Sequence, residues 1–202
     1  MIYLIRHGQT EFNRDGRYQG ACDSPLTALG EVQARLVGRR LSALISPDTP
    51  IVSSPLGRAR ATAEIVRETA GLAAQIEFDP RLAEISMGSW DGLTLAEIEA
   101  MRPAFSFQTP PLDWYMRSPD GETYDAFAAR LGDWLSDHRG RSTPLIVVSH
   151  GVVGRVLRGL YLGFGKDEGL LQHSPQDAFF RLDAGSIERF DCAPLPSEVG
   201  GR

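Results

Sequence analysis

The 202-residue sequence predicts an α/β protein with a mostly parallel central sheet and helices on both faces of that sheet. Helical patterns alternate with the first four of its strand-like runs, which is typical of parallel sheets because each crossover returns the chain to the same edge. No change in composition divides the chain, so we expect a single domain over residues 1–202. The runs rich in branched residues lie at residues 2–6, 51–53, 75–78, 144–149, 178–182 and 186–190.

Apolar spacing and capping residues place the helices between these runs. The first helix is expected to open at Thr27 and to carry an apolar stripe as far as Leu44. Ser54 and Pro55 have the properties of the cap and the first residue of a second helix, because serine accepts from free helical N–H groups and proline lacks an N–H. Two later helices are expected over residues 123–138 and 152–162.

A less regular stretch precedes the helix over residues 123–138. Thr94, followed three residues later by Glu97, is a capping box and predicts a short helix that ends before Pro103. Residues 103–122 then have the proline content of a loop, with aromatic side chains that look exposed, namely Phe105, Phe107 and Trp114. Because a loop of this length inside a compact domain is usually functional, we interpret residues 84–122 as a lid region.

The charge balance and the cysteines narrow the choice of partners. The 21 basic and 26 acidic side chains leave a net charge of −5 and a pI near 5.4, which argues against general electrostatic binding to nucleic acid or to an anionic membrane. The apolar run at residues 2–5 stops at Arg6 and is too short for a signal peptide or a membrane span. Cys22 and Cys192 lack the close spacing of a zinc knuckle or a redox dithiol. We therefore expect a cytoplasmic protein that binds a small molecule.

Two of the four histidines share one local setting. His7-Gly8 and His150-Gly151 each follow a buried-type strand, so both imidazoles are expected at strand carboxyl ends, the edge at which open α/β sheets bind ligands. A histidine that merely ends a strand is the ordinary interpretation of either pair alone. The coincidence of both pairs favours a site in which the two rings face each other across a crevice.

Two arginines are expected at the same edge. Arg6 adjoins His7, and Arg58 lies in the first turn of the helix that follows residues 51–53. Guanidinium groups beside imidazoles at a helix N-terminus suit a phosphoryl group, whose oxygens accept bidentate hydrogen bonds. The ordinary interpretation of Arg58 by itself is a solvated helix residue.

A metal site built on the histidines and a nucleotide-binding loop at Gly165 and Lys166 are the alternatives to a phosphoryl site. The sequence has no His-x-His, no His-Glu-x-x-His and no aspartate beside either His-Gly pair. Around Gly165 and Lys166 it lacks the first glycine and the Ser or Thr of a Walker loop. We therefore expect neither a metal ion nor a cofactor.

Motif residues recur in order up to about residue 190. They are Ile5-Arg6-His7-Gly8-Gln9-Thr10 with Asn13, Gln19-Gly20 and Asp23-Ser24-Pro25-Leu26-Thr27; Ser53-Ser54-Pro55-Leu56 with Arg58; Leu82-Ala83-Glu84 with Gly88, Trp90 and Gly92; Pro119-Asp120-Gly121-Glu122-Thr123; and Val148-Ser149-His150-Gly151. Together these blocks resemble the signature of the histidine phosphatase superfamily, which includes cofactor-dependent phosphoglycerate mutases. Gln9 stands where that family commonly has glutamate, and Thr123 where it has serine, and neither position handles protons or phosphate.

The resemblance implies a role for each candidate residue. It makes His7 the nucleophile and Glu84 the general acid, and it builds the phosphate pocket from Arg6, Arg58 and His150, the last as an imidazolium. Because one nitrogen of the attacking ring must be unprotonated, we expect the other to donate to a backbone carbonyl such as that of Gly8. Substrate contacts are expected from Asn13, Gln19, Gly20 and Gly151.

Within that family, the chain looks more like the compact phosphatase branch. Family mutases of the glycolytic type carry a longer insertion after the glutamate, whereas here residues 88–92 follow in a chain of only 202 residues. We therefore expect a metal-independent phosphomonoesterase that acts on a small phosphorylated substrate. A phosphoglycerate mutase is the first alternative, and a non-catalytic protein that binds a phosphorylated ligand is the second. The motifs leave open the identity of the ester and whether the protein forms a homodimer.

Overall fold

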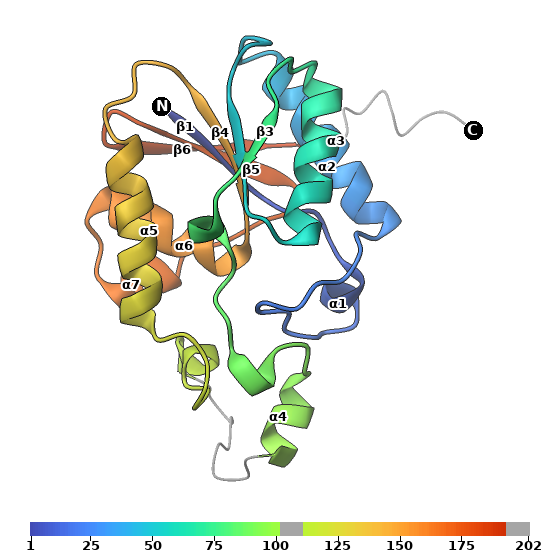
Figure 1. The fold of residues 1–202 in the computed structure, drawn as a ribbon, viewed down its shortest axis with the longest axis vertical. Helices are drawn as coiled ribbons and strands as arrows, with labels where there is room; N and C mark the ends of the chain where they lie inside the picture. The colour runs from blue at the N-terminus through green and yellow to red at the C-terminus, as the bar shows by residue number, and fades with distance from the viewer. Residues whose placement is uncertain (102–110, 193–202) are drawn as a thin grey trace.

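A six-stranded sheet forms the centre of the protein in a computed structural model that describes residues 1–101 and 111–192 (Figure 1). Its strands are β1 (Ile2–Arg6), β2 (Ile51–Ser53), β3 (Ile76–Phe78), β4 (Leu145–Ser149), β5 (Ala178–Asp183) and β6 (Ser186–Asp191), in the order β3-β2-β4-β1-β5-β6. The first four strands pair in parallel, and β5 is antiparallel to both β1 and β6. The predicted mostly parallel sheet is confirmed, and every predicted run is a strand.

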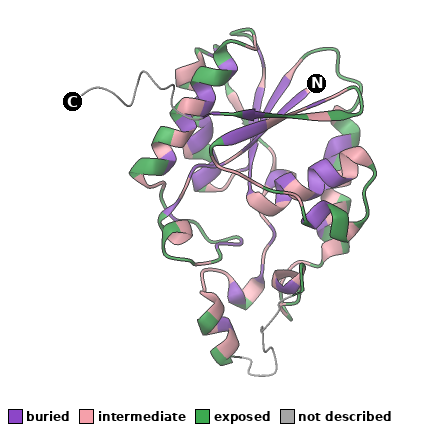
Figure 2. Ribbon diagram, turned by 180° about the vertical axis from the view of Figure 1, so that it is seen from behind, coloured by how far each residue is buried: buried purple, intermediate pink, exposed green. Residues whose placement is uncertain are grey.

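Helices cover both faces of the sheet because residues along a strand point alternately to either side. On one face, Ile2 and Leu4 of β1 share an apolar cluster with residues of α5 (Tyr124–His138) and α6 (Gly151–Leu162). On the other face, Tyr3 and Ile5 share a cluster with residues of α2 (Ala28–Ser42) and α3 (Gly57–Ala70). Figure 2 shows buried residues concentrated in the strands and along the helices beside them. Burial on both sides explains why β1 and β4 are apolar along most of their length.

Of the helix starts predicted at Thr27 and at Ser54, the first is confirmed and the second is not. Thr27 caps α2 as expected, and its hydroxyl accepts from an N–H of the first turn. α3, however, has Leu56 as its N-cap, and Leu56 supplies no side-chain bond. The Asp23 carboxylate caps this helix from a separate loop by accepting from its first two N–H groups. The prediction that Ser54 caps α3 is therefore wrong, because that serine contacts a histidine instead.

The predicted lid region contains more regular structure than expected. α4 (Leu95–Met101) follows the predicted capping box, in which Thr94 and Glu97 each bond the backbone N–H of the other. The 3-10 turns η2 (Gly88–Trp90) and η3 (Trp114–Met116) lie on either side of it in the chain. Trp114 is only 7% exposed, because its ring packs 4.7 Å from that of Tyr18 and 6.3 Å from that of Trp90. The predictions of an exposed Trp114 and of a loop throughout residues 103–122 are thus wrong, while Phe105 and Phe107 lie outside the described residues.

Three short elements complete the fold and were not predicted, because each is too short to show a helical period. They are α1 (Glu11–Arg14), η1 (Pro80–Leu82) and α7 (Lys166–Leu170). In residues 1–101 and 111–192, no helix is long and apolar enough to cross a membrane.

Candidate active site

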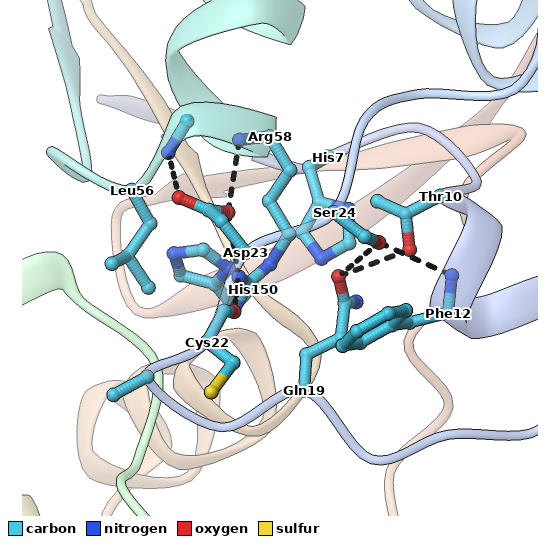
Figure 3. A network of polar contacts seen from close by, with 12 residues as sticks. His7, Thr10, Phe12, Gln19, Cys22, Asp23, Ser24, Leu56, Arg58 and His150 are labelled. Carbon is cyan, nitrogen blue, oxygen red and sulfur yellow. Dashed lines mark hydrogen bonds and ion pairs between the residues drawn. The ribbon is translucent and has the colours of Figure 1, made fainter. Parts of the chain in front are cut away.

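The register of the sheet brings the two His-Gly pairs together. Arg6 and Ser149, the last residues of β1 and β4, are paired across these parallel strands, so the histidines that follow them lie side by side. The ring centroids of His7 and His150 are 5.2 Å apart, and both side chains are buried (Figure 3). The expectation that the two imidazoles meet at the carboxyl edge of the sheet is confirmed.

His7 has the tautomer that nucleophilic attack requires. Its Nδ1 lies 2.8 Å from the carbonyl oxygen of Gly8, as expected from the sequence. Since a carbonyl only accepts, Nδ1 carries the proton and Nε2 keeps its lone pair. Burial, followed by the charges of Arg6 and Arg58, lowers the pKa of His7 well below its usual 6.5. The ring is therefore neutral at physiological pH.

His150 lies beside His7 and contacts Ser54. Its Nε2 is 2.7 Å from the Ser54 hydroxyl, whereas its Nδ1 is buried without a hydrogen-bond partner among the described residues. Burial is the largest cause that lowers the pKa of His150 well below 6.5, and the charge of Arg58 is the next. Desolvation thus favours the neutral ring in the protein by itself, and the imidazolium expected beside a phosphoryl group stays a prediction.

Arg58 is fixed by the loop that also caps α3. Its Nη1 donates to the carbonyl of Cys22 at 2.6 Å and to the Asp23 carboxylate at 2.9 Å, and its Nη2 donates to the carbonyl of Gly20 at 2.8 Å (Figure 3). The side chain is almost fully buried, and burial lowers the pKa of Arg58 from its usual value. These bonds hold the guanidinium in one orientation, with its Nε left without a partner in the described part of the chain.

Arg6 approaches the histidines from β1. Its Nη1 donates to the carbonyl of Ser174 at 2.5 Å, and burial lowers the pKa of Arg6 to about 10, so the group is still charged at neutral pH. The first residue of α6, Gly151, lies against this guanidinium, since a Cβ built on it would be 3.5 Å from Arg6 Cζ. Both arginines and both histidines are thus ordered by protein contacts before any substrate arrives, which is the arrangement that stabilises developing charge without reorganisation.

Glu84 caps α6 at the margin of the site. Its carboxylate accepts from the N–H groups of Ile85, Val152 and Val153 at 3.1, 3.1 and 3.3 Å. His150, the N-cap residue of α6, supplies no side-chain bond, so Glu84 takes that role. The helix start thereby fixes the carboxylate beside the pocket.

Asn13 and Gln19 present amide donors. The amide oxygen of Gln19 accepts from the hydroxyls of Thr10 and Ser24 at 3.0 and 3.1 Å (Figure 3). The amide oxygen of Asn13 accepts from Gln176 at 2.9 Å and from the backbone N–H of Thr10. Because both amide oxygens already accept hydrogen bonds, the NH2 group of each amide is the part that can bind a ligand. An NH2 group donates, so it suits an anionic ligand.

A pocket of about 440 Å³ opens between these groups. The expected site residues that line it are Arg6, His7, Asn13, Gln19, Gly20, Arg58, Glu84 and Gly151. His150 is not among the lining residues, although its ring lies beside that of His7. The pocket combines a neutral imidazole with fixed cations and amide donors, which is suited to binding and attacking a phosphoryl group.

Comparison with known proteins identifies the family. The model of the histidine phosphatase superfamily (branch 1) matches residues 2–183. The chain belongs to this superfamily. This confirms the resemblance found in the sequence motifs.

Relatives of this histidine phosphatase superfamily member differ in their named activities. It is 41% identical over 170 residues to a probable phosphoglycerate mutase GpmB of Photorhabdus laumondii, which covers 80% of this chain and 74% of the relative. The solved structure of Bacillus stearothermophilus YhfR matches with a TM-score of 0.77 at 33% identity, over 93% of each chain. A mycobacterial glucosyl-3-phosphoglycerate phosphatase in a complex with VO3 matches with a TM-score of 0.75 at 29% identity, over 94% of this chain and 96% of that one.

The superfamily motifs did not assign every residue that orders the site. Asp23 and Ser54 stand inside recognised blocks, yet their contacts with Arg58 and His150 follow only from the fold. Gln176, which bonds Asn13 and the His7 carbonyl, lies in a loop without any motif. The motif blocks therefore marked Asp23 and Ser54 as candidates, whereas no sequence pattern marked Gln176.

Proposed function

We propose that this chain is a phosphatase that hydrolyses a phosphate monoester through a phosphohistidine on His7, without a metal ion or cofactor. One observation carries the proposal: the His7 Nδ1 donates to the Gly8 carbonyl, which leaves Nε2 as a free nucleophile in a pocket lined by Arg6 and Arg58. The phosphatase named among the structural neighbours supports the same reaction.

The first step transfers the phosphoryl group to the protein. The His7 Nε2 lone pair forms a bond to phosphorus while the bond from phosphorus to the ester oxygen breaks. Glu84, in its protonated form, gives its proton to the departing alkoxide. Its Oε2 accepts a single backbone bond, from Val152, and so keeps a lone pair on which that proton resides.

Fixed donors stabilise the phosphoryl oxygens as charge develops. Arg6 and Arg58 supply guanidinium N–H groups, and Asn13 supplies its amide NH2. The buried Nδ1 of His150 is a further donor when its Nε2 accepts from the Ser54 hydroxyl. A phosphate dianion beside that ring also favours its protonated form, which adds positive charge where the substrate needs it.

The second step regenerates the protein. Glu84, now a carboxylate, takes a proton from a water molecule whose oxygen attacks the phosphohistidine. The bond from Nε2 to phosphorus breaks, inorganic phosphate forms, and the lone pair returns to His7. Over one turnover, Glu84 gives one proton to the leaving alkoxide and takes one from water, so it returns to its starting protonated form.

The experiment that tests the proposal is trapping of the intermediate. A 32P-labelled ester and an acid quench should yield acid-labile phosphate on His7, and His7→Ala should lose both the label and turnover. His138→Ala is the matched control, because His138 stacks on Trp134 of α5 and does not line the pocket. Turnover that persists in His7→Ala, or label found on His150, would refute the assignment.

A phosphoglycerate mutase is the second candidate, favoured by the 41% identical relative that carries this name. A mutase retains its phosphohistidine long enough for a bound phosphoglycerate to reorient. With 3-phosphoglycerate and a trace of 2,3-bisphosphoglycerate, isomerisation faster than phosphate release would identify the mutase, and the reverse order the phosphatase. A merely ligand-binding protein would show neither product.

A further inference from the structure

The pocket extends beyond the reacting groups to Arg155 and Tyr115. Arg155 lies one helical turn after Gly151 on α6, and Tyr115 lies in η3 of the lid region. Both line the same pocket as His7 and Glu84. Because helical side chains lean toward the helix N-terminus, that of Arg155 extends toward the site.

Nε of Arg155 is buried without a hydrogen-bond partner within residues 1–101 and 111–192, and the buried hydroxyl of Tyr115 has the Arg155 side chain as its polar neighbour. The other pocket arginine outside the phosphoryl site, Arg17, differs in this respect. Its guanidinium donates to both oxygens of Glu97, at 2.9 and 3.2 Å. A partly buried guanidinium without a counter-ion is costly, and an anionic ligand offsets that cost.

The charges of the side chains that line the pocket also favour an anionic ligand. Four arginines face one carboxylate there, although the chain as a whole carries a net charge of −5. In the proposed reaction, Arg6 and Arg58 bind the phosphoryl oxygens. The Glu97 carboxylate neutralises Arg17. Only the charge of Arg155 is left unmatched by a described residue or by the phosphoryl group.

Tyr115 is suited to help bind an anion. Its hydroxyl lies beside the Arg155 guanidinium, and burial raises the pKa of Tyr115 to about 12. The phenol therefore stays protonated, and its O–H group can donate a hydrogen bond to a bound anion. The charge of Arg155 is also among the causes that lower the pKa of Arg6, which places this pair close to the phosphoryl site.

We propose that Arg155 and Tyr115 bind a second anionic group of the substrate, a carboxylate or a second phosphate, within reach of the phosphoryl group held by Arg6 and Arg58. This inference rests on the proposed function, and it narrows the substrate to phosphate esters that carry another acidic group. Neutral alcohol phosphates would bind in the same pocket without using these two side chains.

Phosphonates test the subsite without turnover, because their C–P bond is not hydrolysed. Calorimetric titration would compare 3-phosphonopropionate and 1,3-propanediphosphonate with propylphosphonate, which lacks a second acid. In the wild type, a charge-assisted contact of this kind should favour the best diacid by about tenfold to a hundredfold. That preference should collapse in Arg155→Met and fall partly in Tyr115→Phe, while the exposed Arg117→Met, outside the pocket, retains it.

The two diacids distinguish carboxylate from phosphate as the second group. A wild type that binds neither diacid better than propylphosphonate, or an Arg155→Met variant with an unchanged preference, would overturn the subsite. Failure of the proposed function would look different: the diacid preference would be present, yet 3-phosphoglycerate and glycerol 3-phosphate would both release no phosphate and leave no label on His7.

Discussion

Replacement of Glu84 by glutamine separates its chemical role from its structural one. Glutamine retains one carbonyl oxygen but cannot supply a proton to a departing alkoxide. Proton donation matters when the leaving oxygen is basic and matters little when it is a stable phenolate. Glu84→Gln should therefore slow the phosphorylation of His7 by alkyl esters more than its phosphorylation by aryl esters.

The structure sets the size of each effect. Glu84 accepts three backbone N–H groups, two on Oε1 and one on Oε2, and the amide NH2 of glutamine can accept none. With its oxygen in the Oε1 position, the variant loses the bond from Val152, at a cost of about 1–3 kcal/mol in unfolding free energy. Loss of the general acid should slow phosphorylation by an alkyl ester by about a hundredfold to ten-thousandfold.

Single-turnover burst kinetics provide the assay, because the later attack of water does not mask phosphorylation of His7. A sugar or glycerate phosphate should show the full loss, and p-nitrophenyl phosphate far less. Glu122→Gln is the matched control: that carboxylate is paired with Arg130 at 2.7 and 2.8 Å and does not line the pocket. Equal losses for both esters in Glu84→Gln would make Glu84 a capping residue of α6 and refute its role as the acid.

Two further predictions follow from the charges of the site. Since Arg6 and Arg58 line the pocket and would neutralise the phosphoryl oxygens in the proposed reaction, hydrolysis should be unchanged after EDTA treatment, and loss of turnover that magnesium or zinc restores would contradict the mechanism. The pKa values of His7 and His150 are lowered in the folded state, so below about pH 6.5 the unfolded chain binds more protons. The unfolding free energy should then fall with decreasing pH by up to about 1.4 kcal/mol per unit for each ring. Thermal melts between about pH 8 and 5 should show this decline, with a smaller slope in His150→Gln, and an equal slope in that variant would exclude His150 as a contributor.

Much of the fold could be predicted because its main elements leave periodic patterns. In β1, Ile2 and Leu4 face one helical layer while Tyr3 and Ile5 face the other, and such two-sided burial produces a continuous apolar run. The elements that were missed, α1, η1, η2, η3 and α7, are five residues or shorter. The packing of Trp114 was missed for another reason: its partners Tyr18 and Trp90 are distant in sequence.

The meeting of the two histidines could be predicted because each directly follows a strand at the ligand-binding edge, whereas Glu84 could be proposed only from its motif block. The groups that hold the two arginines could not be predicted, since several are backbone carbonyls, such as those of Gly20 and Cys22 around Arg58 and that of Ser174 on Arg6. Every residue has a carbonyl, so no residue type marks these positions. Only the folded path of the loops selects them.

The charge of His150 shows a different limit of sequence reasoning. An inventory of charges and substrate chemistry suggests an imidazolium there, because a phosphate dianion attracts positive charge. The fold instead buries the ring beside His7, and desolvation is the largest cause of its lowered pKa, followed by the charge of Arg58. Positive charge at His150 therefore depends on the substrate, whereas that of Arg6 and Arg58 does not. We therefore expect such a site to gain positive charge at His150 when a phosphate dianion binds, while the Gly8 carbonyl, which accepts from Nδ1, favours the neutral form of the unphosphorylated His7 ring.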